Sequence, residues 1–343
     1  MSDLTVTTGP GFSTLHNGLQ ELAGNNSSTI QEIPVQNEVF QKTETPPADV
    51  LKPAPVVSAD SEETRTYRKL LDAATDARLN AYAPTSHYLV GAAILTKSGK
   101  IYTGCNTELT AYADHGEQVA IGKAQADGET EIVAIALQCG SEGKPLGFKP
   151  ESNAPCGNCR QALFECNPDL KVILPNGPEG MEVHTVRDLL PVAYQRKREP
   201  WNNPQVVEEH FSDPLVEEAL IARSNARVPR SHYPVGAAVE TADGRIFRGS
   251  KIEASSFSSQ AERLAMANAI SQGAKDIVRI AIVGGNDPHK GETPLNMTWD
   301  SFQAIAQVAP NAVVLLPDET GEFIAHSMRE FPSFLVVNTP KPG

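Results

Sequence analysis

The first regular pattern in the chain is a helical spacing of apolar residues that begins near Glu62. The apolar positions between charged residues are Tyr67, Leu70, Leu71, Ala74, Ala77 and Ala81. Pro84 marks the end of this predicted helix. Two apolar runs follow at 90–95 and 100–104, and the turn residues Lys97-Ser98-Gly99 between them predict a β-hairpin.

The next segments alternate between helix and strand. The pattern predicts a helix over 115–126 that ends at Gly128, a buried strand over 132–138, a helix after Pro155 and a strand over 171–174. Strands interleaved with helices indicate a sheet covered by helices. The expected fold class is therefore α/β, in the form of a three-layer α/β/α domain.

The same pattern occurs twice. Residues 86–93 read Ser-His-Tyr-Leu-Val-Gly-Ala-Ala, and residues 231–238 read Ser-His-Tyr-Pro-Val-Gly-Ala-Ala, an offset of 145 positions. Glu108 and Glu253 keep this offset. Two copies of one domain are the simplest interpretation. His87 and His232 recur in both copies, which favours a shared structural role for them.

The repeat and the composition together predict the domain organisation. Residues 1–60 are rich in Ser, Thr, Asn, Gln and Pro without periodicity, so we expect a disordered tail. Residues 61–195 form the first copy, 196–213 a polar linker, and 214–343 the second copy.

Charge and cysteine usage limit the partners and the compartment. Lys and Arg total 29 against 42 Asp and Glu, a net charge of -13, so phosphate binding would oppose the overall field. A small-molecule substrate is favoured, and no nucleic-acid partner is expected. Neither a signal peptide nor a membrane-spanning run is indicated, so no membrane contact is expected. The five cysteines, an odd number within 105–166, indicate a reducing compartment, and we expect a cytoplasmic protein.

Two motifs of the first copy carry the candidate chemistry, His115-Gly116-Glu117 and Pro155-Cys156-Gly157-Asn158-Cys159. One His and two Cys suit Zn²⁺, and three protein ligands leave the fourth tetrahedral position open, as in catalytic sites. Cys156 and Cys159 at a helix start face the same way, and the helix dipole favours their thiolate form. His115 and Glu117 are two residues apart and converge only at a helix start, where Asp114 and Glu117 offer a capping signal.

Each motif alone has a structural alternative. Glu117 closes a capping box beside an ordinary half-buried His115, and the Cys-x-x-Cys pair is a redox pair or half of a structural zinc site. Together, in an alternating α/β chain, the two motifs are the signature of zinc deaminases.

Over roughly residues 62–194 the first copy resembles the cytidine deaminase family. The segments that carry the resemblance are Tyr88-Leu89-Val90-Gly91-Ala92-Ala93, Gly104-Cys105-Asn106-Thr107-Glu108, Pro155-Cys156-Gly157-Asn158-Cys159-Arg160-Gln161 and Leu189-Leu190-Pro191. The resemblance implies a Zn²⁺ cofactor and hydrolytic deamination of cytidine or deoxycytidine to uridine or deoxyuridine plus ammonia. Glu117 is then the catalytic acid and base, moving a proton from water to the pyrimidine.

The resemblance also implies roles for Asn106 and Glu108, and the chemistry of the metal ligands indicates one for Arg160. Asn106 and Glu108 hold the ribose hydroxyls, with a polar turn as the alternative for both. Arg160 hydrogen-bonds a thiolate, with a surface arginine as the alternative. The segment Gly140–Asn153 looks like an insertion beside the substrate pocket.

The second copy lacks the metal ligands. Gln260 stands at the position of His115, and if Pro294 aligns with Pro155, then Leu295 and Thr298 replace the cysteines. A His ligand with a degenerate second copy resembles the two-domain, dimeric branch of the family, so we expect a homodimer in which this copy packs on the first. Arg-Gln after Cys159 resembles the short, tetrameric branch.

Three rival functions remain. A deaminase of another amino-heterocycle would use the same chemistry. A polynucleotide editor is disfavoured by the net charge of -13. A non-catalytic deaminase-like scaffold is disfavoured by the intact Glu117 beside a complete ligand set.

Overall fold

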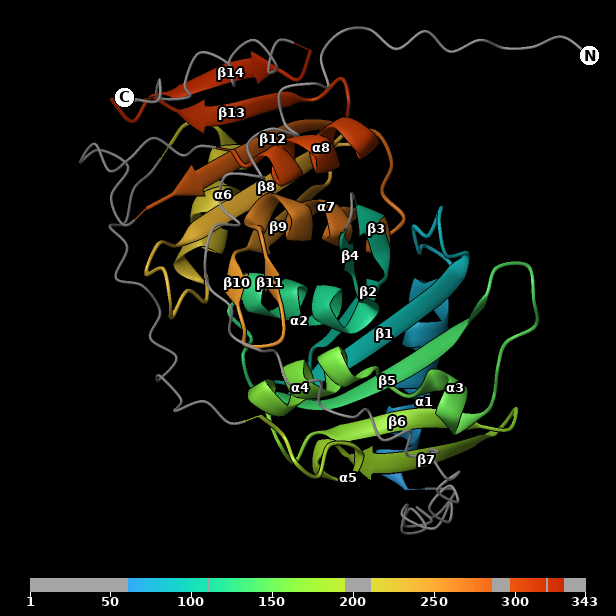
Figure 1. Ribbon diagram of the computed structural model, residues 1–343. Helices are drawn as coiled ribbons and strands as arrows, with labels where there is room; N and C mark the ends of the chain where they lie inside the picture. The colour runs from blue at the N-terminus through green and yellow to red at the C-terminus, as the bar shows by residue number, and fades with distance from the viewer. Residues whose placement is uncertain (1–60, 110–111, 195–210, 286–296, 319, 330–343) are drawn as a thin grey trace, which may run out of the picture. The chain divides into compact units, whose positions relative to one another are not determined.

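The computed structural model describes residues 61–109, 112–194, 211–285, 297–318 and 320–329 (Figure 1). The expected tail, most of the expected linker, and Pro294 and Leu295 lie outside the described residues. No helix in the described part of the chain has the length and apolar character that a membrane span needs. We call residues 61–194 the first half and residues 211–329 the second half.

Both halves are built from the same series of elements. The first half contains α1 Glu62–Arg78, β1 Tyr88–Thr96, β2 Ile101–Cys105, β3 Thr107–Leu109, β4 Tyr112–Asp114, α2 Gly116–Ala126, β5 Ile132–Ser141, α3 Pro150–Asn153, α4 Gly157–Cys166, β6 Lys171–Asn176, β7 Gly180–Thr185 and α5 Val186–Leu189. The second half contains α6 Pro214–Ser224, β8 Val235–Thr241, β9 Ile246–Ser250, β10 Ile252–Glu253, β11 Ser258–Ser259, α7 Ala261–Ser271, β12 Ile277–Gly284, α8 Trp299–Val308, β13 Val313–Pro317 and β14 Phe323–Ser327.

The two five-stranded sheets have one topology. The first has the order β2-β1-β5-β6-β7, and the second has the equivalent order β9-β8-β12-β13-β14. In each sheet a single neighbouring pair is parallel, β5 with β6 and β12 with β13, and the other pairs are antiparallel. A parallel pair needs a crossover connection, which α4 and α8 supply.

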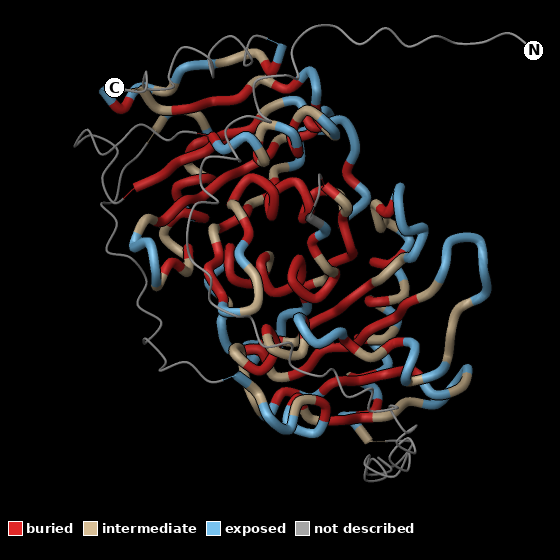
Figure 2. The backbone as a smooth tube through the Cα atoms, in the orientation of Figure 1, coloured by how far each residue is buried: buried red, intermediate tan, exposed pale blue. Residues whose placement is uncertain are grey.

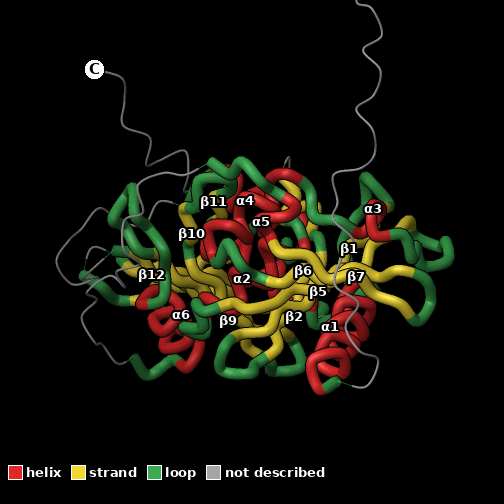
Figure 3. The backbone as a smooth tube through the Cα atoms, turned by 90° about the horizontal axis from the view of Figure 1, so that it is seen from below, coloured by secondary structure: helices red, strands yellow, loops and turns green. Residues whose placement is uncertain are grey.

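Alternation along the strands divides the core into two layers. In β1, Ala93 packs with Leu70 and Ala74 of α1, whereas Ala92 and Ile94 face the opposite side, with α2 and α4. Figure 3 shows the strands as the middle layer, with α1 and α6 on one side and α2 and α4 on the other. The predicted three-layer α/β/α fold, present twice, is confirmed.

The predicted hairpin, helices and strands of the first half are also present. The first helix ends at Arg78, before Pro84, because the chain at Tyr82 leaves the helical path to pair with Thr107. His87 and His232 both have φ of 52°, in the left-handed region. The histidine recurs in both halves because both loops need this conformation, and His is one of the few non-glycine residues enriched there.

The halves pack through α2 and α7, whose residues are almost entirely buried (Figure 2). The helices approach closely because Gly122 has no side chain; an added Cβ would lie 3.0 Å from Leu264 of α7. Two side-chain amide hydrogen bonds that are related by the repeat also join the halves. Asn80 donates to the carbonyl of Ser271, and Asn225 donates to the carbonyl of Ala126, and both pairs are related by the offset of 145.

Candidate metal centre and catalytic site

His115 is the N-cap of α2 and has extended backbone angles, φ -77° and ψ 152°. This conformation turns its ring away from the helix axis and toward the start of α4. Nδ1 of His115 lies 3.5 Å from Sγ of Cys156 and 3.4 Å from Sγ of Cys159. The sequence predicted that His115 and Glu117 converge only at a helix start, and the structure places them there.

The two cysteines come from the first turn of α4. Cys156 is the N-cap and is exposed, whereas Cys159 is fully buried. Together with His115 they form a group whose potential ligand atoms all lie within 4.8 Å of one another. Cys105, Cys139 and Cys166 are outside this group.

These distances fit a tetrahedral Zn²⁺ ion. With bonds of about 2.3 Å to sulfur and about 2.1 Å to nitrogen, tetrahedral angles separate the N and S ligands by about 3.6 Å. The observed separations of 3.5 and 3.4 Å agree with this value, and they identify Nδ1 of His115 as the nitrogen that faces the ion. The donor set of one imidazole and two sulfurs is of the type that zinc prefers.

Hydrogen bonds within the group favour a thiolate. The bond that Cys156 accepts from Cys159, and next the bond from His115, lower the pKa of Cys156 to about 3. The same contact with Cys156, together with burial, raises the pKa of Cys159. The hydrogen bond with Cys156 also raises the pKa of His115. One negative charge is therefore present in the pair, and a divalent cation favours loss of the second thiol proton.

Glu117 lies directly behind this group. Its side chain is buried, at 4% exposed, and hydrogen-bonds Cys159. Burial raises the pKa of Glu117 above its usual range, because the charged form loses its hydration. A buried carboxyl with a raised pKa beside a metal-ligand cluster is suited to accept and release a proton near neutral pH.

The predicted capping role of Asp114 and Glu117 is wrong. Gln118 closes the helix start, since its Oε1 accepts a hydrogen bond from the main-chain N–H of His115 at 3.1 Å. Asp114 instead ends strand β4, and its carboxylate contacts the second half through Ser259 and Arg263. Because Gln118 closes the helix start, Glu117 is left to face the cysteines.

The two predicted ribose residues make main-chain hydrogen bonds. Asn106 accepts from the N–H of Val90 at 2.8 Å and donates to the carbonyl of Tyr88 at 2.9 Å. Glu108 accepts from the N–H of Thr85 at 2.7 Å, and these loop bonds outweigh its burial, so its pKa is lowered. Asn106 thus holds the first residues of β1, Glu108 holds the loop before that strand, and the contact of either side chain with a sugar stays a prediction.

Arg160 lies beside the Pro155–Cys156 turn. Its Nε donates to the carbonyl of Pro155 at 2.8 Å and its Nη1 donates to the carbonyl of Leu189 at 3.0 Å. These bonds tie the metal-ligand turn to the end of α5. Tyr88 is 39% exposed, and its hydroxyl donates to the carbonyl of Ser152.

The expected replacements for the cysteines in the second half need correction. Thr298 is the N-cap of α8, as Cys156 is the N-cap of α4, and the hydroxyls of Thr298 and Ser301 lie 2.8 Å apart. Thr298 and Ser301 are therefore the counterparts of Cys156 and Cys159. The offset between the halves falls from 145 to 142 in the loop before α8, so aligning Pro294 with Pro155 gave the wrong register.

Two further residues, which belong to no motif, make buried contacts near this site or beside its elements. Asn153, at 0% exposed, joins the segment 140–153 to the end of β5, accepting from the N–H of Cys139 and donating to the carbonyls of Gly147 and Lys149. The other is Arg263, which reaches the start of α2 from the second half. Neither belongs to a motif, and no sequence pattern indicates their partners.

Known proteins resemble both halves of this chain. Residues 64–174 match the family model "Cytidine and deoxycytidylate deaminase zinc-binding region", and residues 217–321 match the model "Cytidine deaminase-like". The zinc-binding match spans all three residues of the candidate metal group. Zinc is therefore the metal that this region of the family binds, in agreement with the ligand distances.

Relatives named cytidine deaminase include two of different length. One from Sporosarcina psychrophila is 40% identical over 132 residues, which cover 38% of this chain and 91% of the relative. One from Salmonella dublin is 33% identical over 207 residues, which cover 57% of this chain and 63% of the relative. The match therefore spans a little under two thirds of the Salmonella protein.

Solved structures of cytidine deaminases match as well. The structure from Burkholderia pseudomallei is 38% identical and covers 37% of this chain and 98% of its own, with a TM-score of 0.32. The structure from Mycobacterium leprae is 35% identical and covers 36% of this chain and 97% of its own, with a TM-score of 0.31.

Proposed function

The chain belongs to the cytidine deaminase family, and we propose that it catalyses the hydrolytic deamination of cytidine or deoxycytidine to uridine or deoxyuridine plus ammonia. The observation that carries this proposal is the buried carboxyl of Glu117 in hydrogen-bond contact with the group His115, Cys156 and Cys159. We assign catalysis to residues 61–195, and we propose that residues 214–343 are a zinc-free copy that supports them.

The proposed chemistry follows from the residues of this group. His115, Cys156 and Cys159 would hold Zn²⁺, and the ion would supply the Lewis acidity that makes the attacking water molecule more acidic. Glu117 accepts the proton of that water at its carboxylate as the oxygen adds to C4 of the pyrimidine. Glu117 delivers that proton to N3, then takes the remaining proton from the new C4 hydroxyl and passes it to the amine, so that C4–N breaks, C4=O forms and ammonia leaves.

We propose that Asn106 and Glu108 also contact the ribose, and that Arg160 holds the Pro155–Cys156 turn in place beside the thiolates. Main-chain hydrogen bonds to the carbonyls of Pro155 and Leu189 fix the orientation of Arg160, which supports its role. A carboxylate oxygen accepts more than one hydrogen bond, so Glu108 retains acceptor capacity for a sugar hydroxyl.

A second candidate is the deaminase of another amino-heterocycle. The observation that favours it is that Asn106 and Glu108 already hold the start of β1 and the loop before it, which weakens the argument for a dedicated ribose site. The catalytic group would be the same, because it acts on the ring carbon that bears the amino group and not on the sugar.

Partner and compartment are also proposals. We propose a homodimer in the cytoplasm that does not bind nucleic acid. The net charge of -13 supports the lack of nucleic-acid binding, and the five free cysteines support the compartment.

A substrate comparison tests the proposed function. Cytidine, deoxycytidine, free cytosine and a cytosine-containing oligonucleotide would be compared by kcat/KM in ammonia release. We expect turnover of the nucleosides to exceed that of cytosine by more than about 100-fold, since lost polar contacts with a substrate hydroxyl are costly. Turnover of cytosine at an equal rate, or turnover of none of the four by zinc-loaded protein, would contradict the proposed function and favour the second candidate.

A further inference from the structure

A buried ion-pair bridge links the start of the catalytic helix to the second half. Arg263 of α7 is 5% exposed in its side chain and contacts one acid in each half. Its Nη2 lies 3.0 Å from Oδ2 of Asp114 in the first half, and its Nη1 lies 2.8 Å from Oδ2 of Asp300 in the second. Asp114 is equally buried, at 7% exposed in its side chain.

The acid in the first half stands immediately before the metal group. Asp114 ends β4, and the next residue, His115, is the N-cap of α2. The second oxygen of Asp114 accepts a hydrogen bond from Ser259 at 3.1 Å. The second half therefore holds both oxygens of Asp114, and through them it fixes the point from which the chain presents His115 and Glu117.

The bridge exists in one direction only. By the offset of 145, Asp114 corresponds to Ser259 and Arg263 corresponds to Gln118. Gln118 makes a local bond to the N–H of His115, whereas Arg263 reaches across the interface. The reversed position has two uncharged residues, Ser259 and Gln118. Among the described residues, the bridge thus serves the half that has the metal ligands, and no equivalent ion pair serves the other.

A buried pair is not explained by stability alone. Desolvating two charges offsets most of their attraction, and apolar replacements are often as stable, whereas the geometry of a hydrogen-bonded guanidinium is well defined. We propose that Arg263 is a positioning residue for the catalytic half, and that its bridge to Asp114 sets the placement of His115 and Glu117. This inference rests on the proposed function.

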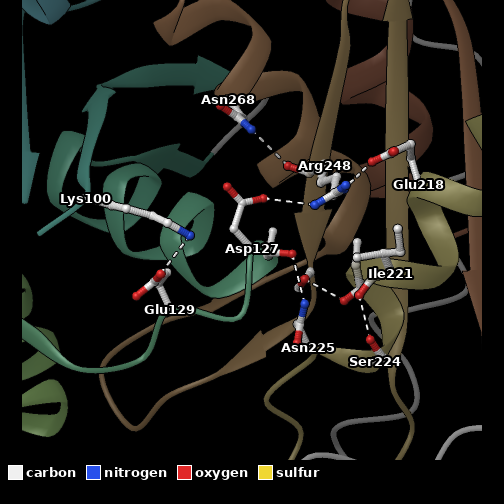
Figure 4. A network of polar contacts seen from close by, with 12 residues as sticks. Lys100, Asp127, Glu129, Glu218, Ile221, Ser224, Asn225, Arg248 and Asn268 are labelled. Carbon is white, nitrogen blue, oxygen red and sulfur yellow. Dashed lines mark hydrogen bonds and ion pairs between the residues drawn. The ribbon is translucent and has the colours of Figure 1, made fainter. Parts of the chain in front are cut away.

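The far end of α2 offers a matched control. Arg248 of β9 also contacts one acid in each half, Asp127 at the C-cap of α2, at 3.2 Å, and Glu218 of α6 (Figure 4). The two arginines hold opposite ends of one helix across one interface. Only the end held by Arg263 carries a metal ligand, so a loss specific to Arg263 is not a general effect of loosening the interface.

The experiment uses the full chain loaded with zinc, as wild type, Arg263→Gln, Arg263→Lys and Arg248→Gln. Zinc release into a chromophoric chelator is measured without substrate, and kcat and KM for cytidine are measured separately. Groups that orient metal ligands typically change metal affinity or activity by about 10–100-fold when they are replaced. We therefore expect Arg263→Gln to release zinc about 10–100-fold faster than wild type and to lose about 10–100-fold in kcat. KM should change less than about threefold, since the substrate contacts are elsewhere. Arg263→Lys should recover part of the loss.

Equal zinc release and equal kcat in Arg263→Gln and Arg248→Gln would overturn the proposal. If Arg263→Gln fails to fold with Asp114 unpaired, the double variant Asp114→Asn with Arg263→Gln removes both charges, and the same expectations apply. Zinc release does not require turnover, so a wild type that binds zinc but does not deaminate cytidine would contradict the proposed function and still test the bridge.

Discussion

The carboxylate of Glu108 accepts main-chain hydrogen bonds from Thr85 and Ser86, and the carboxylate of Glu253, 145 residues later, accepts the equivalent pair in the second half. A role that persists where the metal ligands are lost is structural. A comparison of the two residues therefore separates the structural role, which both have, from any additional role of Glu108 in binding substrate.

We expect Glu108→Gln and Glu253→Gln each to destabilise the protein by about 1.5–3 kcal/mol, because each removes the charge from an acceptor of main-chain hydrogen bonds. The loss should be larger for Glu253→Gln, which also breaks the ion pair with Lys251 at 3.2 Å. If Glu108 also contacts the ribose, only Glu108→Gln should raise KM for cytidine, by about 10-fold or more. Urea unfolding and steady-state kinetics on both variants check this. An unchanged KM in both would leave Glu108 with the structural role alone.

The stabilisation by Glu253 should depend on pH. Burial raises the pKa of Glu253, but hydrogen bonds involving Ser231 and Arg230 outweigh it and lower the pKa from 4.5 to about 2. A lowered carboxyl pKa stabilises the folded state above the unfolded pKa, and this stabilisation is lost as the pH falls toward the folded value. The gap in unfolding free energy between wild type and Glu253→Gln should be constant from pH 7 to about 5 and shrink below about 4.5. A gap that widens on acidification would contradict this sign.

The cysteines of α4 should differ sharply in their effect on zinc. Cys159→Ser removes a ligand and should abolish tight zinc binding, whereas Cys166→Ser, seven residues later on the same helix, should leave one zinc per chain. Metal analysis after dialysis against a chelator measures this. Zinc retention by Cys159→Ser, or its loss from Cys166→Ser, would place the metal elsewhere.

Asn153 should be important for stability. Its fully buried amide contacts Cys139, Gly147 and Lys149, so Asn153→Ala leaves buried main-chain groups without partners. One such group costs about 1–3 kcal/mol, and we expect a loss of at least about 2 kcal/mol in the free energy of unfolding. The exposed neighbour Glu151, changed to Ala, is the control and should have little effect. Equal unfolding curves for both variants would contradict the assigned role.

The elements and the metal group followed from the sequence because both depend on local spacing. His115 and Cys156 lie at helix starts that the hydrophobic pattern and Pro155 indicate, and the repeat showed that the sheet is built twice. The contacts between the halves could not be predicted from the sequence. Asp114 and Arg263 are 149 residues apart, and the pattern around Asp114 favours a local cap until the pairing of β4 places its carboxylate at the interface.

The register of the second half was missed for a related reason. Thr298 matches Cys156 only when three positions are removed from the loop before α8, and proline alone is too weak a marker to show where they are lost. The N-cap hydrogen bond of Thr298 to the N–H of Ser301 settles the register. Short polar residues cap helices, so they fill the positions of the lost ligands without disturbing α8.

The central claim is that Glu117 transfers protons at a zinc site in the first half. Glu262 is its counterpart in the second half, also buried and also with a pKa raised by burial, so the pair Glu117→Gln and Glu262→Gln changes the same side chain in the same setting. The most direct test is the rate of cytidine absorbance loss for both variants, each confirmed to carry one zinc. We predict that Glu117→Gln loses at least about 100-fold in kcat and that Glu262→Gln keeps wild-type kcat. Substantial turnover by zinc-loaded Glu117→Gln would contradict the claim.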